Sequence, residues 1–376
     1  MKKLLLVLTL IPTLLFSQSY EEKINKAGEA LQKKEFCNAL TFFENAFKET
    51  EKIGIYDLAF ASTAALNCNK EKLALTWLKL SQEKGLGLNP GEAENIINDP
   101  VFEKLQQFSE WNEFVLAMQT AYKEKELIVL KQKEEWNKTL VNNQVEDKKS
   151  VVKNGYAIYF TKVDNLEIPF LVYVPENYDA KKPTKTIVYL HGGIVNAENF
   201  NFEDPNVVGE PIFEIGKQFN SIIIYPFGKK DFGWVNQIKA FENIYTIITL
   251  AKTKYNIGSI YLGGMSNGAT AAFWFANQKQ NQFKGFFAFS PNPKLEIGTI
   301  NFKNLSQDKP FLSVNAVDDS VFNYKDVFAI YNSNKNLATD WKFQTLETGN
   351  HGFIYNGKEG FEIMKSLFSK LIENKK

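Results

Sequence analysis

Histidine and cysteine are scarce in this chain, with two residues of each type among 376. A structural zinc site needs a tetrahedral set of histidine and cysteine ligands at close spacings, and no such pattern occurs. The lysine-bearing phosphate loop and the G-x-G-x-x-G dinucleotide fingerprint are also absent from the sequence. We therefore expect no metal site, and catalysis that requires no cofactor.

The chain also lacks a large excess of positive or negative charge. The 44 Lys and Arg residues nearly cancel the 43 Asp and Glu residues, and the basic residues form no run. This balance argues against nucleic acid or an acidic membrane surface as a partner. The apolar fraction of 44% is globular, and 376 residues are enough for two domains.

Long apolar runs are confined to the N-terminus. Lys2 and Lys3 precede an apolar stretch over residues 4–16, and the small residues Ser17 and Ser19 follow. This layout is typical of a signal peptide, here residues 1–19, and the stretch is shorter than the roughly 20 residues that span a bilayer. We expect cleavage after Ser17 or Ser19, an exported protein (periplasmic or secreted), and no transmembrane segment after signal removal. The alternative is an N-terminal anchor or a buried helix.

Residues 20–120 have helical periodicity, with alanine and leucine recurring at three- and four-residue spacing. Breaks near Lys34, Gly54 and Asn69 divide the segment into four helices of roughly 12 to 15 residues. Two such helix pairs resemble tetratricopeptide repeats, a domain that could bind a protein partner, and a small helical bundle is the alternative. Residues 121–150, rich in Lys and Glu, are predicted to be a charged helical linker.

From residue 151 to 376 the pattern changes to strands that alternate with helices. Helices are predicted at Lys239–Tyr255, Ala269–Gln278, Tyr324–Ser333 and Glu359–Asn374. Strands are predicted at Tyr156–Thr161, Ile168–Val174, Lys185–Leu190, Ser221–Tyr225, Ser259–Leu262, Gly285–Phe289, Pro310–Val314 and Trp341–Leu346. Two hairpin-like strands followed by βα units predict the α/β class, with a doubly wound, mostly parallel sheet that binds ligands at the carboxyl ends of its strands.

The pattern Gly264-Met265-Ser266-Asn267-Gly268 follows a predicted strand and begins a predicted helix. This is the setting of a G-x-S-x-G nucleophile elbow, in which a strained turn exposes the serine hydroxyl above the sheet. A serine hydroxyl is a poor nucleophile at neutral pH and needs a neighbouring base, most often histidine. Ser266 is therefore the predicted nucleophile.

Chain order selects the partners of Ser266. In elbow enzymes the acid and then the histidine follow the serine, which excludes His191 and leaves His351, in a loop after the last strand. Asp318 and Asp319 both follow the strand Pro310–Val314. Aligning Asn315 with the first position of an H-G-x-x-D-x-x-V strand end favours Asp319 as the acid and leaves Asp318 as a solvated turn residue.

Several motifs together resemble the α/β-hydrolase family, and within it esterases of the feruloyl-esterase and polyhydroxybutyrate-depolymerase kind. They are residues 172–178 (VYVPENY), His191-Gly192-Gly193, the elbow, Asp319 and His351. The resemblance covers residues 151–376. It implies that the backbone N–H groups of Gly193 and Asn267 form the oxyanion hole. If the family resemblance is set aside, the residues alone favour a structural role for His191 over a catalytic one.

These features predict a serine hydrolase that cleaves a carboxylic ester through an acyl-enzyme. The substrate would be a small-molecule or polysaccharide-linked ester. A serine peptidase of the prolyl-oligopeptidase kind is one alternative, although nothing in the sequence reads as the β-propeller that such enzymes usually carry. A helical-repeat interaction protein with a degenerate hydrolase scaffold is another.

The two cysteines, Cys37 and Cys68, both lie in the helical domain. Cys37 is near the start of the second predicted helix and Cys68 near the end of the third. Consecutive helices joined by a short turn are antiparallel, so these two ends should lie side by side. Export would provide oxidising conditions. The sequence leaves two alternatives: the two cysteines form a disulfide, or both are buried as free thiols.

Overall fold

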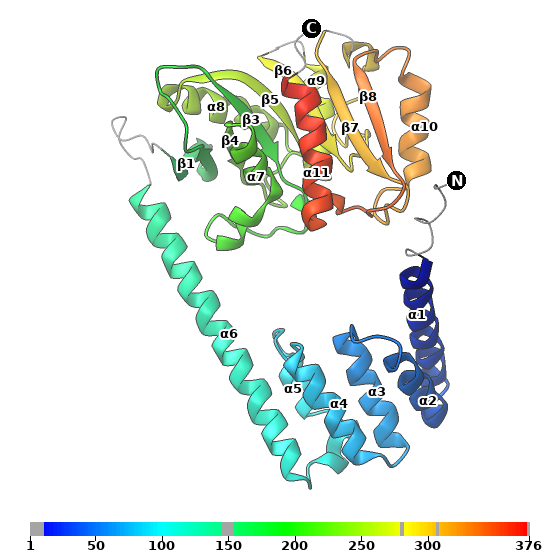
Figure 1. Cartoon of the computed structure of the whole chain (residues 1–376). Coiled ribbons are helices and arrows are strands. Elements are labelled where there is room, and N and C mark those ends of the chain that lie inside the picture. Colours follow the sequence, from blue (N-terminus) through cyan, green and yellow to red (C-terminus); the bar gives the residue numbers. More distant parts are fainter. Residues whose placement is uncertain (1–10, 144–153, 279–281, 306–307, 374–376) are drawn as a thin grey trace, which may run out of the picture. The chain divides into compact units, whose positions relative to one another are not determined.

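Figure 1 shows a computed structural model of the chain. It describes residues 11–143, 154–278, 282–305 and 308–373, with side chains described for those between 20 and 372. The predicted signal peptide lies outside these residues, apart from the backbone of 11–19, and stays a prediction. No helix among the described residues has the length and apolar character needed to cross a bilayer. The chain divides into two compact units, Met1–Lys131 and Gln132–Lys376.

The first unit is helical. Left-handed residues end its first and third helices, at Lys34 (φ 60°) and Asn69 (φ 55°), close to the predicted breaks. Helices α1 and α2 form one pair and α3 and α4 another, and buried alanines from all four allow their backbones to approach closely. The helices of this unit are α1 (Ile11–Gln32), α2 (Phe36–Phe47), α3 (Ile55–Asn67), α4 (Glu71–Glu83), α5 (Glu92–Ile97), the short 3-10 helix Pro100–Leu105 and the start of α6 (Ser109–Asn142).

A disulfide joins Cys37 at the start of α2 to Cys68 at the end of α3, with the two α-carbons 5.5 Å apart. The antiparallel packing of α2 on α3 brings these helix ends together. Closing a loop between cysteines 31 residues apart restricts the unfolded chain, which stabilises the helical unit.

The long helix α6 belongs to both units, and the division of the chain falls within it. Its C-terminal part coincides with the predicted charged linker, yet that part is not solvated throughout. Trp136 and Leu140 are 8% and 4% exposed and join the core of the second unit. The indole Nε1–H of Trp136 donates to the carbonyl of Phe202 at 2.9 Å.

The second unit is built on one sheet, which contains eight strands in the described residues, in the order β1-β2-β4-β3-β5-β6-β7-β8. β2 is antiparallel to both of its neighbours, and the strands from β4 to β8 run parallel. The mostly parallel α/β sheet predicted from the sequence is confirmed. The strands are β1 (Gly155–Val163), β2 (Leu166–Val174), β3 (Thr184–Leu190), β4 (Ile222–Pro226), β5 (Ile257–Met265), β6 (Phe283–Phe289), β7 (Phe311–Ala316) and β8 (Trp341–Leu346).

Helices cover both faces of the sheet (Figure 1). Side chains alternate along β3, so that Val188 and Leu190 join the core on one face while Ile187 and Tyr189 join the core on the other. One face is covered by α8 (Ile238–Lys254), α9 (Asn267–Asn277) and α10 (Tyr324–Asn334). The other face is covered by α7 (Pro211–Gln218), α11 (Gly357–Phe368) and the end of α6.

Candidate active site

Ser266 lies in the turn between β5 and α9. Its backbone has φ 53° and ψ −114°, a strained conformation for a residue with a side chain. The turn is held by the bond from Ser266 N–H to the carbonyl of Phe289, at 2.9 Å, and by the bond from Thr270 N–H to the carbonyl of Ser266. A strand, a strained serine and a helix follow one another here as a nucleophile elbow requires.

The two glycines of the elbow pattern are needed for close packing. A β-carbon added at Gly264 would lie 1.9 Å from the carbonyl oxygen of Leu190, and one added at Gly268 would lie 1.8 Å from the same oxygen. Both contacts involve backbone atoms of β3, which cannot turn aside as a side chain can. The elbow therefore sits directly against the end of the neighbouring strand.

His351 links Ser266 to Asp319 by hydrogen bonds. Its Nε2 lies 2.9 Å from the Ser266 hydroxyl, and its Nδ1 lies 2.9 and 3.1 Å from the two carboxylate oxygens of Asp319. The phenyl ring of Phe322 meets the imidazole edge to face at 5.1 Å. The structure thus brings together the three residues that the sequence singled out, from loops that follow β5, β7 and β8.

The two neighbouring aspartates have different surroundings. The Asp319 side chain is completely buried, and its Oδ1 accepts the N–H groups of Val321 and Phe322, both at 2.8 Å. Asp318 is exposed and lies in a turn, as the prediction of a solvated turn residue has it, and it also accepts hydrogen bonds. Its carboxylate accepts the N–H groups of Gly349 and Asn350, and the bond from Asn350 lowers the pKa of Asp318.

His191 holds the loop that follows β3. Its Nε2 accepts the N–H of Gly228 at 3.0 Å, so the ring proton is on Nδ1, which donates to the carbonyl of Gly192 at 2.7 Å. The ring stacks on Tyr225 with centroids 5.5 Å apart. Burial lowers the pKa of His191 to about 4, so the ring is neutral at pH 7. These contacts match the structural role that the sequence favoured for His191.

The loop after β3 reaches the elbow through its glycines. A β-carbon on Gly192 would lie 3.0 Å from the β-carbon of Ser266, so the loop passes directly beside the serine. Gly193 has φ 72°, which glycine adopts without strain. Asn267 is the first residue of α9, and the first N–H groups of a helix have no acceptor within it. The predicted oxyanion donors, Gly193 and Asn267, therefore both belong to segments that adjoin Ser266.

Two cavities adjoin these segments. One of about 120 Å³ contains Asn267 and Phe322 in its wall, next to Ser266 and His351 respectively, and its other walls include Trp234, Val235 and Leu295. Its remaining lining residues are polar or charged: Thr270, Asn292, Lys294 and Glu296.

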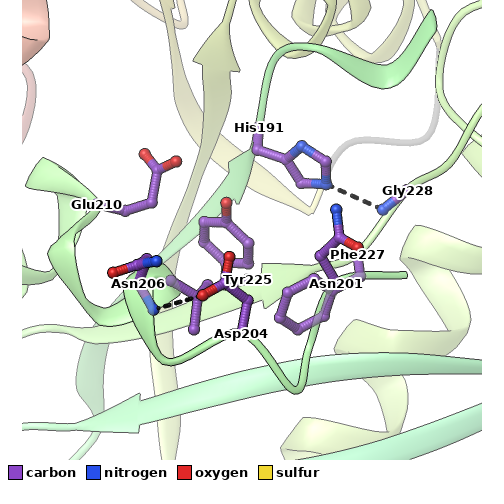
Figure 2. Close-up of a pocket in the computed structure, with 9 residues that line it drawn as sticks. His191, Asn201, Asp204, Asn206, Glu210, Tyr225, Phe227 and Gly228 are labelled. Atoms are coloured by element: carbon purple, nitrogen blue, oxygen red, sulfur yellow. Dashed lines mark hydrogen bonds between the residues drawn. The ribbon is translucent and has the colours of Figure 1, made fainter. Parts of the chain in front are cut away.

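The second cavity, of about 220 Å³, lies against His191 and is lined largely by polar residues (Figure 2). Asp204 and Glu210 line it together with the ring of Tyr225. Burial raises the pKa of Glu210, and the Tyr355 hydroxyl donates to its carboxylate at 3.2 Å. Among the described residues, no group of three or more His, Cys, Asp or Glu could hold a metal ion.

No protein-family model matches the chain, and no curated protein matches its sequence. Solved structures with a similar arrangement include a thermostable esterase (16% identity, TM-score 0.42, 58% of this chain and 61% of that one). An esterase of Pyrococcus furiosus is 16% identical with a TM-score of 0.43, and the match covers 58% of this chain and 91% of that one. An acylaminoacyl peptidase of Pyrococcus horikoshii is 15% identical with a TM-score of 0.44, and the match covers 61% of this chain and 43% of that one. The chain spans less than two thirds of the thermostable esterase and of the peptidase.

The fold class follows from the molecule itself. A mostly parallel sheet carries a serine in a strained strand-to-helix turn after β5, and the acid and the histidine follow in loops after β7 and β8. This combination of sheet, elbow and chain order defines the α/β-hydrolase fold. The second unit therefore has an α/β-hydrolase fold, preceded by a helical unit of paired helices.

Proposed function

We propose that this protein is a serine hydrolase that cleaves carboxylic esters through an acyl-enzyme. The observation that carries the proposal is the continuous hydrogen-bonded chain from Ser266 through His351 to the buried carboxylate of Asp319. The base is within hydrogen-bonding distance of both the nucleophile and the orienting acid, as nucleophilic catalysis requires.

In the first half of the reaction, the Ser266 hydroxyl oxygen attacks the ester carbonyl carbon while His351 Nε2 takes the hydroxyl proton. The carbonyl oxygen becomes an oxyanion, which the N–H groups of Gly193 and Asn267 stabilise; one such donor is typically worth about 10²- to 10³-fold in rate. The imidazolium then gives its proton to the leaving alcohol, and the acyl group remains on Ser266.

In the second half, water takes the place of the alcohol. His351 accepts a proton from the water as it attacks the acyl-enzyme, and returns the proton to Ser266 as the carboxylic acid leaves. Asp319 accepts the Nδ1–H of His351 throughout, which keeps the Nε2 lone pair directed at Ser266 and stabilises the imidazolium. The smaller cavity beside Asn267 and Phe322 is the proposed site for part of the substrate.

A fluorophosphonate probe tests this proposal, followed by a panel of p-nitrophenyl esters and their matched anilides. We expect the wild type to be labelled on Ser266 and to hydrolyse the esters, and Ser266→Ala to lose both properties by more than about 10³-fold. Ser366→Ala, on the exposed side of α11, is the matched control. Retention of more than about a tenth of the activity in Ser266→Ala would exclude Ser266 as the nucleophile.

Export of the protein is also a proposal. The signal-peptide layout of residues 1–19 supports it, and the disulfide between Cys37 and Cys68 is of a kind that persists in oxidising compartments.

A further inference from the structure

The loop after β7 and the loop after β8 are joined by hydrogen bonds in both directions. From the first loop, the Asp318 carboxylate accepts the N–H groups of Gly349 and Asn350 at 3.1 and 2.8 Å. From the second loop, the Asn350 side-chain oxygen accepts the N–H and the hydroxyl of Ser320 at 3.0 and 2.8 Å. We call these four bonds the clasp.

The clasp continues directly into the backbone of His351. The same Asn350 oxygen also accepts the His351 N–H at 2.7 Å, and the Ser290 hydroxyl donates to the His351 carbonyl at 2.7 Å. Both backbone polar groups of His351 are therefore held by side chains. The ring nitrogens remain available for Asp319 and Ser266.

The loop after β8 depends on such outside support. Gly349 has φ 135°, which glycine adopts without strain, whereas Asn350 has φ 56°, in the left-handed region that few residues with a side chain adopt. Strained backbone of this kind persists where surrounding contacts hold it in place. Here the contacts come from Asp318 and from the side chain of Asn350 itself.

We propose that Asp318 and Asn350 are positioning residues, which hold His351 in register with Ser266 and Asp319 through the clasp. The catalytic consequence rests on the proposed function, whereas the structural consequence does not. Misplacement of a catalytic group by about 1 Å can reduce the rate about 100-fold, so a contact that touches no substrate can still control turnover.

Kinetics of clasp variants provide the first test. Asp318→Ala removes the acceptor of two bonds, and Asn350→Gly removes the other acceptor while allowing a positive φ. We expect each variant to lower kcat on p-nitrophenyl acetate about 10- to 100-fold, with KM within about twofold of wild type. Asp318→Asn keeps one oxygen acceptor, so its kcat should fall less than that of Asp318→Ala. The kcat of the variant that combines Asp318→Ala with Asn350→Gly should be little lower than that of the slower single variant, because both residues act through the same loop.

Glu347→Gln is the matched control, since Glu347 is an exposed carboxylate in the same loop that takes no part in the clasp. Its kcat should stay within about twofold of wild type. Melting temperatures identify variants that fail to fold. If Asp318→Ala fails to fold, the milder Asp318→Asn carries the comparison.

Nitrogen NMR of protein labelled in its histidine rings provides a test that is independent of activity. The chain has two histidines, so the spectrum contains two ring systems. We expect Asp318→Ala and Asn350→Gly to broaden the Nδ1–H signal of His351, while the signal of His191, bonded to Gly192, stays unchanged as an internal reference.

The outcomes separate the two proposals. An unchanged His351 signal together with kcat within about twofold of wild type in both variants would overturn the clasp. If the wild type neither reacts with the fluorophosphonate nor hydrolyses any ester, the proposed function has failed, and the ring signals alone then decide the clasp. Broadening of the His351 signal in an inactive protein would still support it.

Discussion

The α-carbon of Gly268 faces the carbonyl oxygen of Leu190 so closely that a β-carbon at this position would lie 1.8 Å from that oxygen. The contact joins the first turn of α9 to the end of β3, two segments far apart in sequence. It explains in physical terms why the last position of the elbow pattern is glycine: the helix that follows Ser266 can meet the strand only without a side chain.

Replacing Gly268 with alanine should therefore disrupt the second unit. The added methyl group meets a backbone atom, so we expect a loss of about 3 kcal/mol or more in the free energy of unfolding, measured by urea denaturation. Gly209→Ala is the control, because a β-carbon at Gly209 would meet no atom within 4 Å. Equal stability of the two variants would contradict the packing described for the elbow.

Asp319→Asn should slow ester hydrolysis far more than Asp318→Asn. The amide can donate an N–H to His351 Nδ1, which favours the tautomer that cannot accept the Ser266 proton and costs about 10⁴-fold in comparable enzymes, whereas Asp318 acts only through the loop. Steady-state kcat values of the two variants, measured side by side, check the ranking. The reverse ranking would transfer the role of the acid to Asp318.

His191 should make the stability of the second unit depend on pH. Burial lowers its pKa to about 4 from 6.5, so between these values the unfolded chain binds more protons than the folded chain. The contribution is fully present above pH 6.5 and is lost as the pH falls towards 4, by at most about 3 kcal/mol.

Urea unfolding of wild type and His191→Gln between pH 7 and 4 measures this effect. Carboxyl groups titrate in the same range, so the expected result is the difference between the two curves: wild type should lose stability more steeply as the pH falls. Parallel curves would mean that His191 does not titrate differently in the folded state.

Cys37 and Cys68 should be bonded in protein purified from an exported fraction. The chain-entropy model gives roughly 3–4 kcal/mol for a loop of this length, so Cys37→Ser with Cys68→Ser should lower the melting temperature of the helical unit. Intact mass after alkylation, with and without reductant, checks the bond. Two thiols that are alkylated without reductant would rule it out.

A fragment beginning at Gln132 should be more stable than one beginning at Val151. Trp136 and Leu140 are buried in the core of the second unit, and removal of a buried tryptophan typically costs about 3–5 kcal/mol. Thermal unfolding of the two fragments gives the comparison. Coincident melting curves would show that these two side chains contribute nothing to the stability of this unit.

Much of the fold could be predicted because it depends on local patterns. All eight predicted strands are present, and the four helices predicted in residues 151–376 correspond to α8, α9, α10 and α11. Helix α7, eight residues long, was not predicted. Such a short segment has too few turns for its periodicity to be distinct, and its Gly216 is needed for close contact with Ile223.

The surroundings of the site could not be predicted to the same extent. The sequence favoured Asp319 over Asp318 by aligning a strand end, but it gave no sign that Asp318 and Asn350 bond across two loops. Nor did it show that Trp136, within a charged segment, joins the core. Each of these features is a pairing between residues far apart in the chain, and local periodicity contains no information about such pairings.

The sequence by itself determined the alternation of strands and helices, the strand–turn–helix setting of Ser266 and, because histidine is so scarce, the choice of His351. Only the tertiary structure decided which aspartate is buried against that histidine and how its loop is held. The reason is that the pairing of β7 with β8, which sets Ala316 opposite Leu346, brings the loops after the two strands side by side. That register, and not the local pattern, gives His351 its partners.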